Sequence, residues 1–491
     1  MTVLQDVSRV RGLCRQLLMV VLINIPTVSL GLAMGWVSLA SGERSGGGED
    51  GGEAGGRVVA AAATTFLASL VGVPLSARAL ANGRKFAVIA TSACFLVCWA
   101  LKLVGGGWWV VSARVAAGLG GAGAFSIPPL VAREMCEASV HGAASSALIL
   151  AHNLGFLLMY LAADLGLQHN TVAWACLGVS ALHCALFLFV PESPAFLCAN
   201  GKQQEAAASL AWLRGLPVGH PALSAELAAL PPPDPVPLTP FALLKDLLKE
   251  QGRRRAFIIS FVAIVGQEAC GVYTLMQFAE RAFVLARDAG VETAVLTANT
   301  TGVIANEHGN GTISVSTDIS AGDWSNAITD VSSSEIVLLS PARQAVILGA
   351  VQLVASMIGL YLVEKVGRRR LLVWAAVVTA LCLASGGAAV LAARGAGAGA
   401  GVALAAAVGA DSAGLQTAPY ALLADMFHYQ VLAGRARGGR GAGAGRAAAG
   451  VALAAAVGAD SAGLQTAPYA LLADMFHCQV LSSSLYSIYT T

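Results

Sequence analysis

Ten stretches of about 20 apolar residues recur along the chain, and they restrict its fold more than any other feature. The hydrocarbon core of a bilayer is about 30 Å thick, so a helix of this length can cross it with every backbone group hydrogen-bonded. Only 12% of the 491 residues are charged, about half the share of a soluble domain. We therefore predict an all-α polytopic membrane protein with spans at 16–40, 58–80, 86–104, 108–131, 143–165, 171–190, 256–280, 343–363, 371–393 and 399–423.

A polar linker divides these spans into two groups, six before it and four after it. It contains the helix-breaking run PPPDPVP. The expected organisation is a cytoplasmic N-terminus (1–15), an N-terminal transmembrane half (16–194), a cytoplasmic linker (195–255), a C-terminal transmembrane half (256–428) and a basic, glycine-rich tail (429–491). Within the tail, residues 449–477 repeat residues 400–428 identically, which indicates a recent duplication or an assembly error.

Lysine and arginine are distributed unevenly between the two sides of this topology. With the N-terminus in the cytoplasm, 22 of them fall in cytoplasmic segments and seven in external ones, as the positive-inside rule requires. The same orientation places the glycine-rich loop 41–56 outside, and residues 46–56 within it are predicted to be a flexible linker. It also places the loop 287–340 outside, with glycosylation sequons at Asn299 and Asn310.

The charge balance and the motif content exclude several classes of function. Thirty Lys and Arg stand against 28 Asp and Glu, so the chain has no strong basic field and nucleic acid is not an expected partner. We find no Cys/His cluster at metal-ligand spacing and no nucleophile with a spaced base, so no metal, cofactor or enzymatic activity is predicted. The GxGxxG match at 118–123 lies inside a span, where small residues favour close helix packing.

Short charged turns at the cytoplasmic ends of helices are the first candidate functional feature. Each half has a tight glycine turn followed by cationic side chains, and carboxylates lie at the ends of other spans. Guanidinium and carboxylate groups form bidentate pairs that can break and re-form. We predict a gating latch of Gly83, Arg84, Lys85, Glu134, Glu364, Gly367, Arg368, Arg369 and Asp425. Inside-positive anchoring is the alternative. Arg114, within span four, is expected to pair near this latch or to extend toward the interface.

Several of these segments resemble the sugar porter family of the major facilitator superfamily. The motifs are PESP at 191–194, ANGRK at 81–85, EKVGRRRLL at 364–372, QEACG at 267–271, GLQTAPYALLADMF at 414–427, and Arg114 and Glu134 around a glycine-rich span four. Within the family the chain looks most like the insect facilitated trehalose transporters. The resemblance implies a multi-pass plasma-membrane carrier with two pseudo-symmetric six-helix halves, and it adds Glu192 of PESP and Arg114 to the latch.

The chain departs from the family pattern at several positions. Leu80 stands where an acidic residue is usual, His141 replaces the arginine after span four, and Ala195 replaces the arginine after PESP. The latch of the N-terminal half is therefore expected to be weakened. Nothing resembles spans eleven and twelve, so the fold is expected to lack its last two helices.

A neutral sugar is coated with hydroxyl groups, so its site must replace water with amides, hydroxyls and an aromatic surface. The resemblance places such groups in spans seven, eight and ten at Gln267, Glu268, Tyr273, Gln352, Ser356 and Tyr420. On one continuous helix Gln267 and Tyr273 would lie about 120° apart, so only one of them would face the sugar. Interhelical hydrogen bonding is the alternative role for each. His152 and His183, in apolar spans, are expected to be packing residues.

Together these features predict a carrier that moves a neutral sugar, trehalose or a hexose, by alternating access. Proton-coupled relatives typically have an aspartate in span one, and this span has none, so facilitated diffusion is favoured over proton symport. Two alternatives stay open. One is a sugar sensor derived from a carrier, and the other is a defective chain that results from an erroneous gene assembly.

Overall fold

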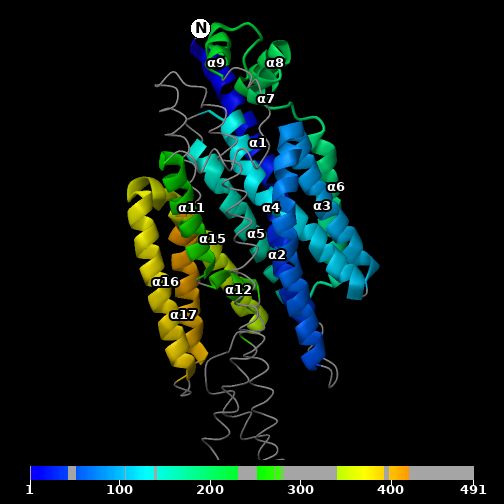
Figure 1. Cartoon of the computed structure of the whole chain (residues 1–491), viewed down its shortest axis with the longest axis vertical. Helices are drawn as coiled ribbons and strands as arrows, with labels where there is room; N and C mark the ends of the chain where they lie inside the picture. The colour runs from blue at the N-terminus through cyan, green and yellow to red at the C-terminus, as the bar shows by residue number, and fades with distance from the viewer. Residues whose placement is uncertain are drawn as a thin grey trace, which may run out of the picture.

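The computed structural model describes residues 2–42, 51–105, 107–137, 141–230, 251–269, 271–277, 279, 283, 340–391 and 397–419. Two groups of long helices stand side by side, α1–α6 in one and α11–α17 in the other, and three short helices lie at the end that carries the N-terminus (Figure 1). The long helices of the first group are α1 (Thr2–Gly42), α2 (Gly51–Asn82), α3 (Arg84–Val104), α4 (Gly107–Met135), α5 (His141–Asp164) and α6 (His169–Phe187).

The short helices and the second group follow. The short helices are α7 (Pro194–Ala199), α8 (Gln203–Arg214) and α9 (Pro221–Ala229). The second group contains α11 (Gln251–Ala269), α12 (Val272–Gln277), α15 (Pro341–Lys365), α16 (Arg368–Leu391), α17 (Gly397–Ala410) and the π-helical turn η1 (Asp411–Leu415). Residues 420–491, which include the repeated segment, lie outside the described residues.

Eight helices of the described part are long and apolar enough to cross a membrane. They are α1–α6, α15 and α16, and they correspond to the first six predicted spans and to the eighth and ninth. The tenth predicted span begins with a shorter apolar segment, Val402–Leu415. The all-α membrane fold expected from the hydropathy pattern is confirmed.

The seventh span, predicted as one helix over 256–280, is interrupted. α11 ends at Ala269 and α12 begins at Val272, with Gly271 between them at a φ of 71°. A positive φ is left-handed backbone that glycine adopts without steric cost and that ends a right-handed helix. Hydropathy reports apolarity but not backbone conformation, so the prediction of one continuous helix over 256–280 was wrong at Gly271.

The stretch 46–56, predicted as a flexible linker, is also partly helical. α2 begins at Gly51 and therefore includes its last six residues. Glycine lowers helix propensity without forbidding a helix, and here the glycines extend a long apolar helix beyond its predicted start. Residues 43–50 lie outside the described residues.

Small residues bring the helices of the first group into close contact. A Cβ atom added to Gly118 would lie 2.1 Å from the Thr65 carbonyl oxygen, and one added to Gly31 would lie 2.2 Å from that of His152. Backbone atoms of α4 and α2, and of α1 and α5, therefore approach as closely as only glycine permits. The interpretation of the GxGxxG match as a packing motif is confirmed.

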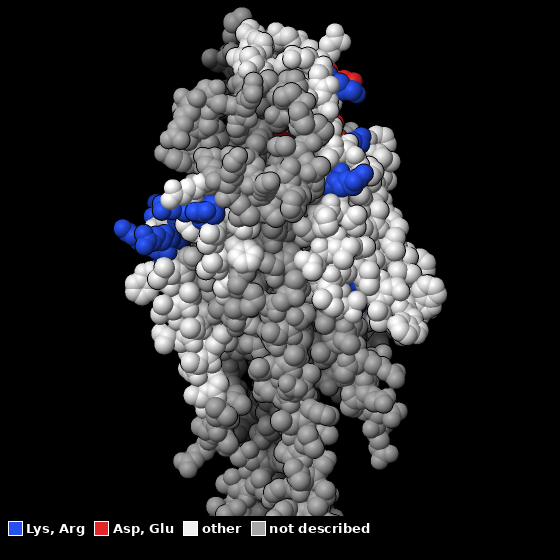
Figure 2. Space-filling model, viewed as in Figure 1, with Lys and Arg blue, Asp and Glu red and all other residues white. Residues whose placement is uncertain are grey.

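The two groups meet along α5, which packs against α15. On the face shown in Figure 2, charged side chains are concentrated toward one end of the molecule. In Figure 2 the visible Lys and Arg side chains gather in the half of the molecule that contains α7–α9, and the opposite half of the described surface is almost free of charge. This distribution leaves a wide apolar surface for lipid.

Candidate functional site

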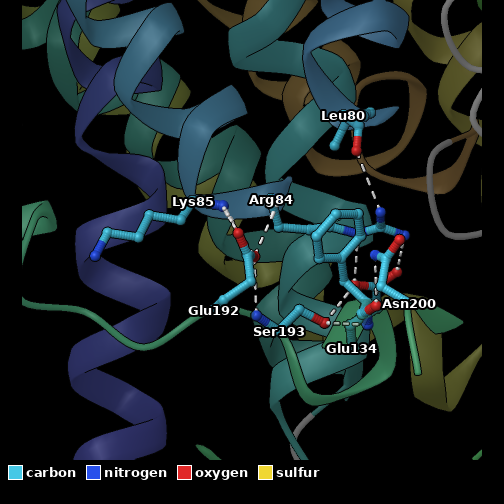
Figure 3. A network of polar contacts seen from close by, with 8 residues as sticks. Leu80, Arg84, Lys85, Glu134, Glu192, Ser193 and Asn200 are labelled. Carbon is cyan, nitrogen blue, oxygen red and sulfur yellow. Dashed lines mark hydrogen bonds and ion pairs between the residues drawn. The ribbon is translucent and has the colours of Figure 1, made fainter. Parts of the chain in front are cut away.

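Arg84 and Glu134 form a bidentate ion pair at the N-terminal end of the bundle (Figure 3). Arg84 is the first residue of α3 and Glu134 the penultimate residue of α4. Arg84 Nε donates to Glu134 Oε2 at 2.8 Å and Nη2 donates to Oε1 at 2.7 Å. Two parallel charge-assisted bonds fix both distance and orientation, so the pair holds α3 and α4 in one relative position.

Glu192 closes the same cluster from the segment between α6 and α7. Its Oε1 accepts the backbone N–H groups of Arg84 at 3.0 Å and Lys85 at 3.1 Å. These N–H groups belong to the start of α3, where the helix dipole favours an anion. Gly83, at a φ of 144°, precedes them, and a Cβ there would lie 2.7 Å from Glu192 Oε2. The glycine is therefore required both by its backbone and by the nearby carboxylate.

Ser193 links this cluster to α7. Its hydroxyl donates to Glu134 Oε2 at 2.6 Å and accepts from the backbone N–H of Phe196, which makes it the N-cap of α7. The Arg84 guanidinium lies 4.9 Å from the centre of the Phe196 ring. The PESP motif thus places one carboxylate and one hydroxyl on the turns that end α6 and begin α7.

The structure brings five predicted latch residues together: Gly83, Arg84, Lys85, Glu134 and Glu192. The counterpart in the second group is described only in part. Gly367, at a φ of 88°, separates α15 from α16, Arg368 is half-buried and Arg369 is exposed. The side chain of Glu364 and the whole of Asp425 lie outside the described residues.

Arg114 does not belong to this cluster, which corrects the expectation that it pairs there. It lies on α4 twenty residues before Glu134, about 30 Å away at the rise of an α-helix. It is 1% exposed, donates from Nη1 to the Ala33 carbonyl at 2.9 Å and lies 4.8 Å from the Trp36 ring centre. Packing of α4 against α1 therefore determines its position, rather than snorkelling to the interface.

A second polar cluster, missed by sequence reasoning, fastens α8 and α9 to the first group. Arg214, at the end of α8, makes two bonds to Glu226 of α9, at 2.5 and 3.1 Å, and donates to the Met135 carbonyl at 3.1 Å. Glu137 lies 3.7 Å from Arg214 and also bonds Gln16 of α1. The available signal in the sequence is the Leu-Arg-Gly at residues 213–215, which ends an alanine-rich segment.

The centre of the molecule contains buried polar side chains from both groups. Asn153 of α5 donates from Nδ2 to Ser356 Oγ of α15 at 2.6 Å and to Gln416 Oε1 at 3.2 Å. Ser356 in turn donates to the Gln352 carbonyl one turn earlier, at 2.8 Å. Gln352 and Ser356, both predicted as substrate-binding residues, are each 1% exposed. Asn153 and Gln416 were not selected from the sequence, although Gln416 lies within the GLQTAPY motif.

The π-helical turn η1 brings a carboxylate to this centre. Asp411, 2% exposed, begins the turn, and Gln416 Nε2 donates to its Oδ2 at 2.9 Å. Gln416 therefore connects Asp411 to Asn153 across the two groups. π-Helical turns are rare and occur frequently at functional sites. Tyr420, predicted here, lies outside the described residues.

Tyr273 and His152 face one another across the same boundary. Tyr273 follows the Gly271 break, and its hydroxyl lies 3.2 Å from His152 Nε2. The two rings are stacked, with centres 5.8 Å apart and planes inclined by 5°. His152, predicted to be a packing residue, is buried among aromatic rings and lies beside the predicted ligand Tyr273. His183 bonds Ser92 and the Leu22 carbonyl, as a packing residue would.

Several buried polar atoms at this centre have no hydrogen bond among the described residues. They are Asn153 Oδ1 and His152 Nδ1 on α5 and Gln352 Oε1 on α15. Ser412 Oγ, in η1, is a further buried atom without a described partner. Gln267, on α11, is 9% exposed and its Oε1 is also unpartnered, but no described contact joins it to Asn153. The backbone of Glu268 is helical, and its side chain lies outside the described residues. Buried polar atoms without partners are costly and rare in native proteins, so this centre is suited to a ligand that supplies hydrogen bonds.

A fold of long membrane helices in two groups, with a polar centre between them, has known counterparts. The structure of the proton:xylose symporter XylE of E. coli bound to 6-bromo-6-deoxy-D-glucose superposes with a TM-score of 0.59, covering 95% of this chain and 90% of that one at 18% identity. Its inward open form gives the same TM-score over 92% of this chain. This likeness defines the class: an all-α membrane protein with the major facilitator fold.

Sequence comparison identifies the family within this class. The family model described as sugar (and other) transporter matches residues 50–306 and 332–436. The chain belongs to this family. Individual relatives match over shorter segments. The bovine solute carrier family 2, facilitated glucose transporter member 8, is 27% identical over 204 residues, 41% of this chain and 40% of that protein.

Two fungal relatives are named for different substrates. The yeast hexose transporter HXT9 of Saccharomyces cerevisiae is 27% identical over 164 residues, 32% of this chain and 29% of that protein. A quinate permease of Neurospora terricola is 29% identical over 147 residues, 27% of each chain. The matched segments thus span less than half of each curated relative's length.

Proposed function

We propose that the protein carries a neutral sugar, a hexose or trehalose, across the plasma membrane by alternating access and facilitated diffusion. The observation that carries this proposal is the pair of buried, unpartnered amide oxygens of Asn153 and Gln352, on α5 and α15, the helices along which the two groups meet. A ligand rich in hydroxyl groups would donate to these amide oxygens. The family, whose members are carriers rather than enzymes, supports the same conclusion.

The polar groups at the centre favour a neutral substrate over a carboxylate such as quinate. The unpartnered atoms of Asn153 and Gln352 are amide oxygens, which accept hydrogen bonds and cannot donate them. A carboxylate group has no proton to give them, and burying an ion without a counter-charge is costly. The buried carboxyl group of Asp411 supplies no such counter-charge. A polyhydroxylated, uncharged ring satisfies the acceptors without this cost.

Contacts between the two groups suggest which end of the pathway is closed. Toward the end of α5 that lies opposite α7–α9, the Tyr160 hydroxyl donates to the Met276 carbonyl, and Asp164 pairs with Arg343 at 3.6 Å. Gln277 contacts the sulfur of Met34 on α1. In the proposed topology this end is external, so these contacts would separate when the outer side opens.

The Arg84 cluster supports a latch role at the proposed cytoplasmic end. Its described contacts join α3, α4 and the start of α7, so they make this end of the first group rigid. Alternating access rocks one rigid bundle against the other around a fixed site. We propose that Arg368, Arg369, Glu364 and Asp425 form the corresponding cluster of the second group, and that the two clusters meet when the cytoplasmic mouth is closed.

Counterflow in proteoliposomes tests the proposal. Vesicles with the purified full chain and preloaded with unlabelled D-glucose or trehalose should accumulate the radiolabelled sugar transiently, and quinate should neither exchange nor compete. Span one has no aspartate between residues 16 and 40, so net uptake should not require a pH gradient. Sugar binding without counterflow would instead identify a sensor. Exchange of quinate in vesicles that contain no sugar would contradict the neutral-substrate assignment.

A further inference from the structure

We infer that His152 binds the substrate directly through Nδ1, and that Tyr273 selects the tautomer in which Nδ1 carries the proton. This inference rests on the proposed sugar-carrier function and assigns a further specificity-determining pair to it. His152 is 4% exposed, and its Nδ1 makes no hydrogen bond among the described residues. An imidazole nitrogen in that position either donates or accepts, so its tautomer decides which ligand atom it can bind.

Aromatic side chains hold the imidazole ring of His152 in place. The Phe125 ring centre lies 5.1 Å away and the Phe156 ring centre 5.2 Å away, the latter edge-on at 89°. Tyr273 stacks on the ring from the other helix group. Offset-stacked and edge-to-face contacts of this kind restrict ring rotation. The two nitrogens of His152 therefore have fixed and different surroundings.

The contact with Tyr273 determines which nitrogen is protonated. The Tyr273 hydroxyl and His152 Nε2 are 3.2 Å apart, so one of them donates to the other. A phenol is a good donor with a poorly basic oxygen, and an unprotonated imidazole nitrogen is a strong acceptor. The hydroxyl therefore donates to Nε2, and the single ring proton of the neutral imidazole resides on Nδ1.

The resulting N–H group complements the other unpartnered atoms. Asn153 Oδ1 and Gln352 Oε1 require donors, whereas Nδ1–H of His152 requires an acceptor. Hydroxyl groups can serve both needs, and the ring oxygen of a pyranose can serve only the second. A neutral sugar matches this mixed set better than a ligand that only donates or only accepts. Tyr273 belongs to the second helix group and His152 to the first. The tautomer of His152 therefore depends on the relative position of the two groups.

Two substitutions at residue 152 separate ligand binding from the contact with Tyr273. The amide nitrogen of asparagine occupies nearly the position of Nδ1, and that of glutamine nearly the position of Nε2. His152→Asn should therefore keep the KM for the transported sugar within about threefold of the wild-type value, and His152→Gln should raise it by about tenfold, as the loss of one hydrogen bond to a buried group implies. Tyr273→Phe should raise KM about threefold, because both tautomers would then be populated.

The measurement is counterflow of radiolabelled D-glucose, or of trehalose if that is the sugar exchanged, with the purified variants. Their thermal unfolding in detergent is measured in parallel. The inference is overturned if His152→Gln behaves as wild type while His152→Asn and Tyr273→Phe are impaired equally, because His152 then only holds Tyr273. Equal KM values in all three variants overturn it as well. Failure of the wild-type protein to exchange any sugar would instead contradict the proposed function. If one of the three variants unfolds, the sugar affinities of the other two are compared by sugar-dependent quenching of tryptophan fluorescence.

Discussion

Arg84 and Glu134 join α3 to α4 through two parallel hydrogen bonds, and the Ser193 hydroxyl donates a third bond to the same carboxylate. The side chains are 21% and 6% exposed, so the pair is largely removed from water. The chain lacks the acidic residue expected at position 80, where it has leucine, yet the Leu80 carbonyl accepts from Arg84 Nη1 at 3.2 Å. The Leu80 carbonyl oxygen thus provides part of the interaction with Arg84 that an acidic side chain at position 80 was expected to make.

Glu134→Gln should destabilise the protein strongly. The substitution leaves the Arg84 guanidinium largely buried without its counter-charge, and breaking such a pair costs about 3 kcal/mol or more in unfolding free energy. Denaturant unfolding in detergent micelles measures this difference. The control is Glu205→Gln, which breaks the exposed Lys202–Glu205 pair and should cost less than about 1 kcal/mol. Equal losses in the two variants would show that Arg84–Glu134 contributes no more than a surface pair.

Gly83→Ala should displace the Glu192 carboxylate from the start of α3. Both Gly83 and Gly367 have positive φ, but an added Cβ meets Glu192 Oε2 at 2.7 Å only at Gly83, whereas nothing lies within 4 Å at Gly367. Gly367→Ala therefore controls for replacing a positive-φ glycine that meets no neighbouring atom, a backbone cost of about 1–3 kcal/mol. We expect a larger loss of thermal stability in Gly83→Ala. Indistinguishable melting temperatures would argue against a steric requirement at Gly83.

Arg214→Ala should release α8 and α9 from the first helix group. The substitution removes the bonds to Glu226, to Glu137 and to the Met135 carbonyl at one position. Limited proteolysis of the purified protein should then cleave the segment after residue 215 at least several-fold faster. Lys202→Ala, which removes an exposed cation at the other end of α8, is the matched control. An unchanged cleavage rate in Arg214→Ala would mean that apolar packing alone holds these helices.

Replacing Arg368 and Arg369 by alanine should shift the carrier toward its inward-facing state. The proposed latch would lose both guanidinium groups of the second helix group, so the cytoplasmic mouth would close less well. A Gln277→Cys reporter, placed at a residue that is fully buried between the groups, should react more slowly with a membrane-impermeant maleimide added outside. Unaltered labelling and unaltered sugar uptake in the double variant would contradict the latch.

The proposed orientation can be tested at the predicted sequons. If the loop 287–340 is external, Asn299 and Asn310 should be glycosylated when the chain is expressed in insect or mammalian cells. Digestion with an N-glycosidase should then increase electrophoretic mobility, and Asn299→Gln and Asn310→Gln should each remove part of this shift. Absence of any glycan, combined with glycosylation of a sequon engineered before residue 10, would invert the topology.

Much of the membrane architecture followed from local sequence. Apolar stretches of about 20 residues predict helices because a bilayer offers no partner for backbone groups outside the helix, and eight predicted spans are helices of that kind. The residues of the Arg84 cluster were also identifiable, because glycine turns, arginines and carboxylates at helix ends carry local signals. The break at Gly271 was missed because apolarity continues through it.

The contacts at the buried centre of the molecule could not be predicted from local sequence in this way. Gln352, Ser356 and Tyr273 could be named from resemblance, but the contacts of Asn153 with Ser356, of His152 with Tyr273 and of Asp411 with Gln416 could not. His152, Asn153 and Asp411 each lie in an apolar stretch that is equally compatible with packing, and which side chains meet depends on how α5, α12 and η1 are placed in space. By itself, the sequence determined which segments enter the membrane, because hydropathy and helix length act locally. Only the tertiary structure decided which polar groups share the buried centre, since contacts between residues more than a hundred positions apart depend on packing.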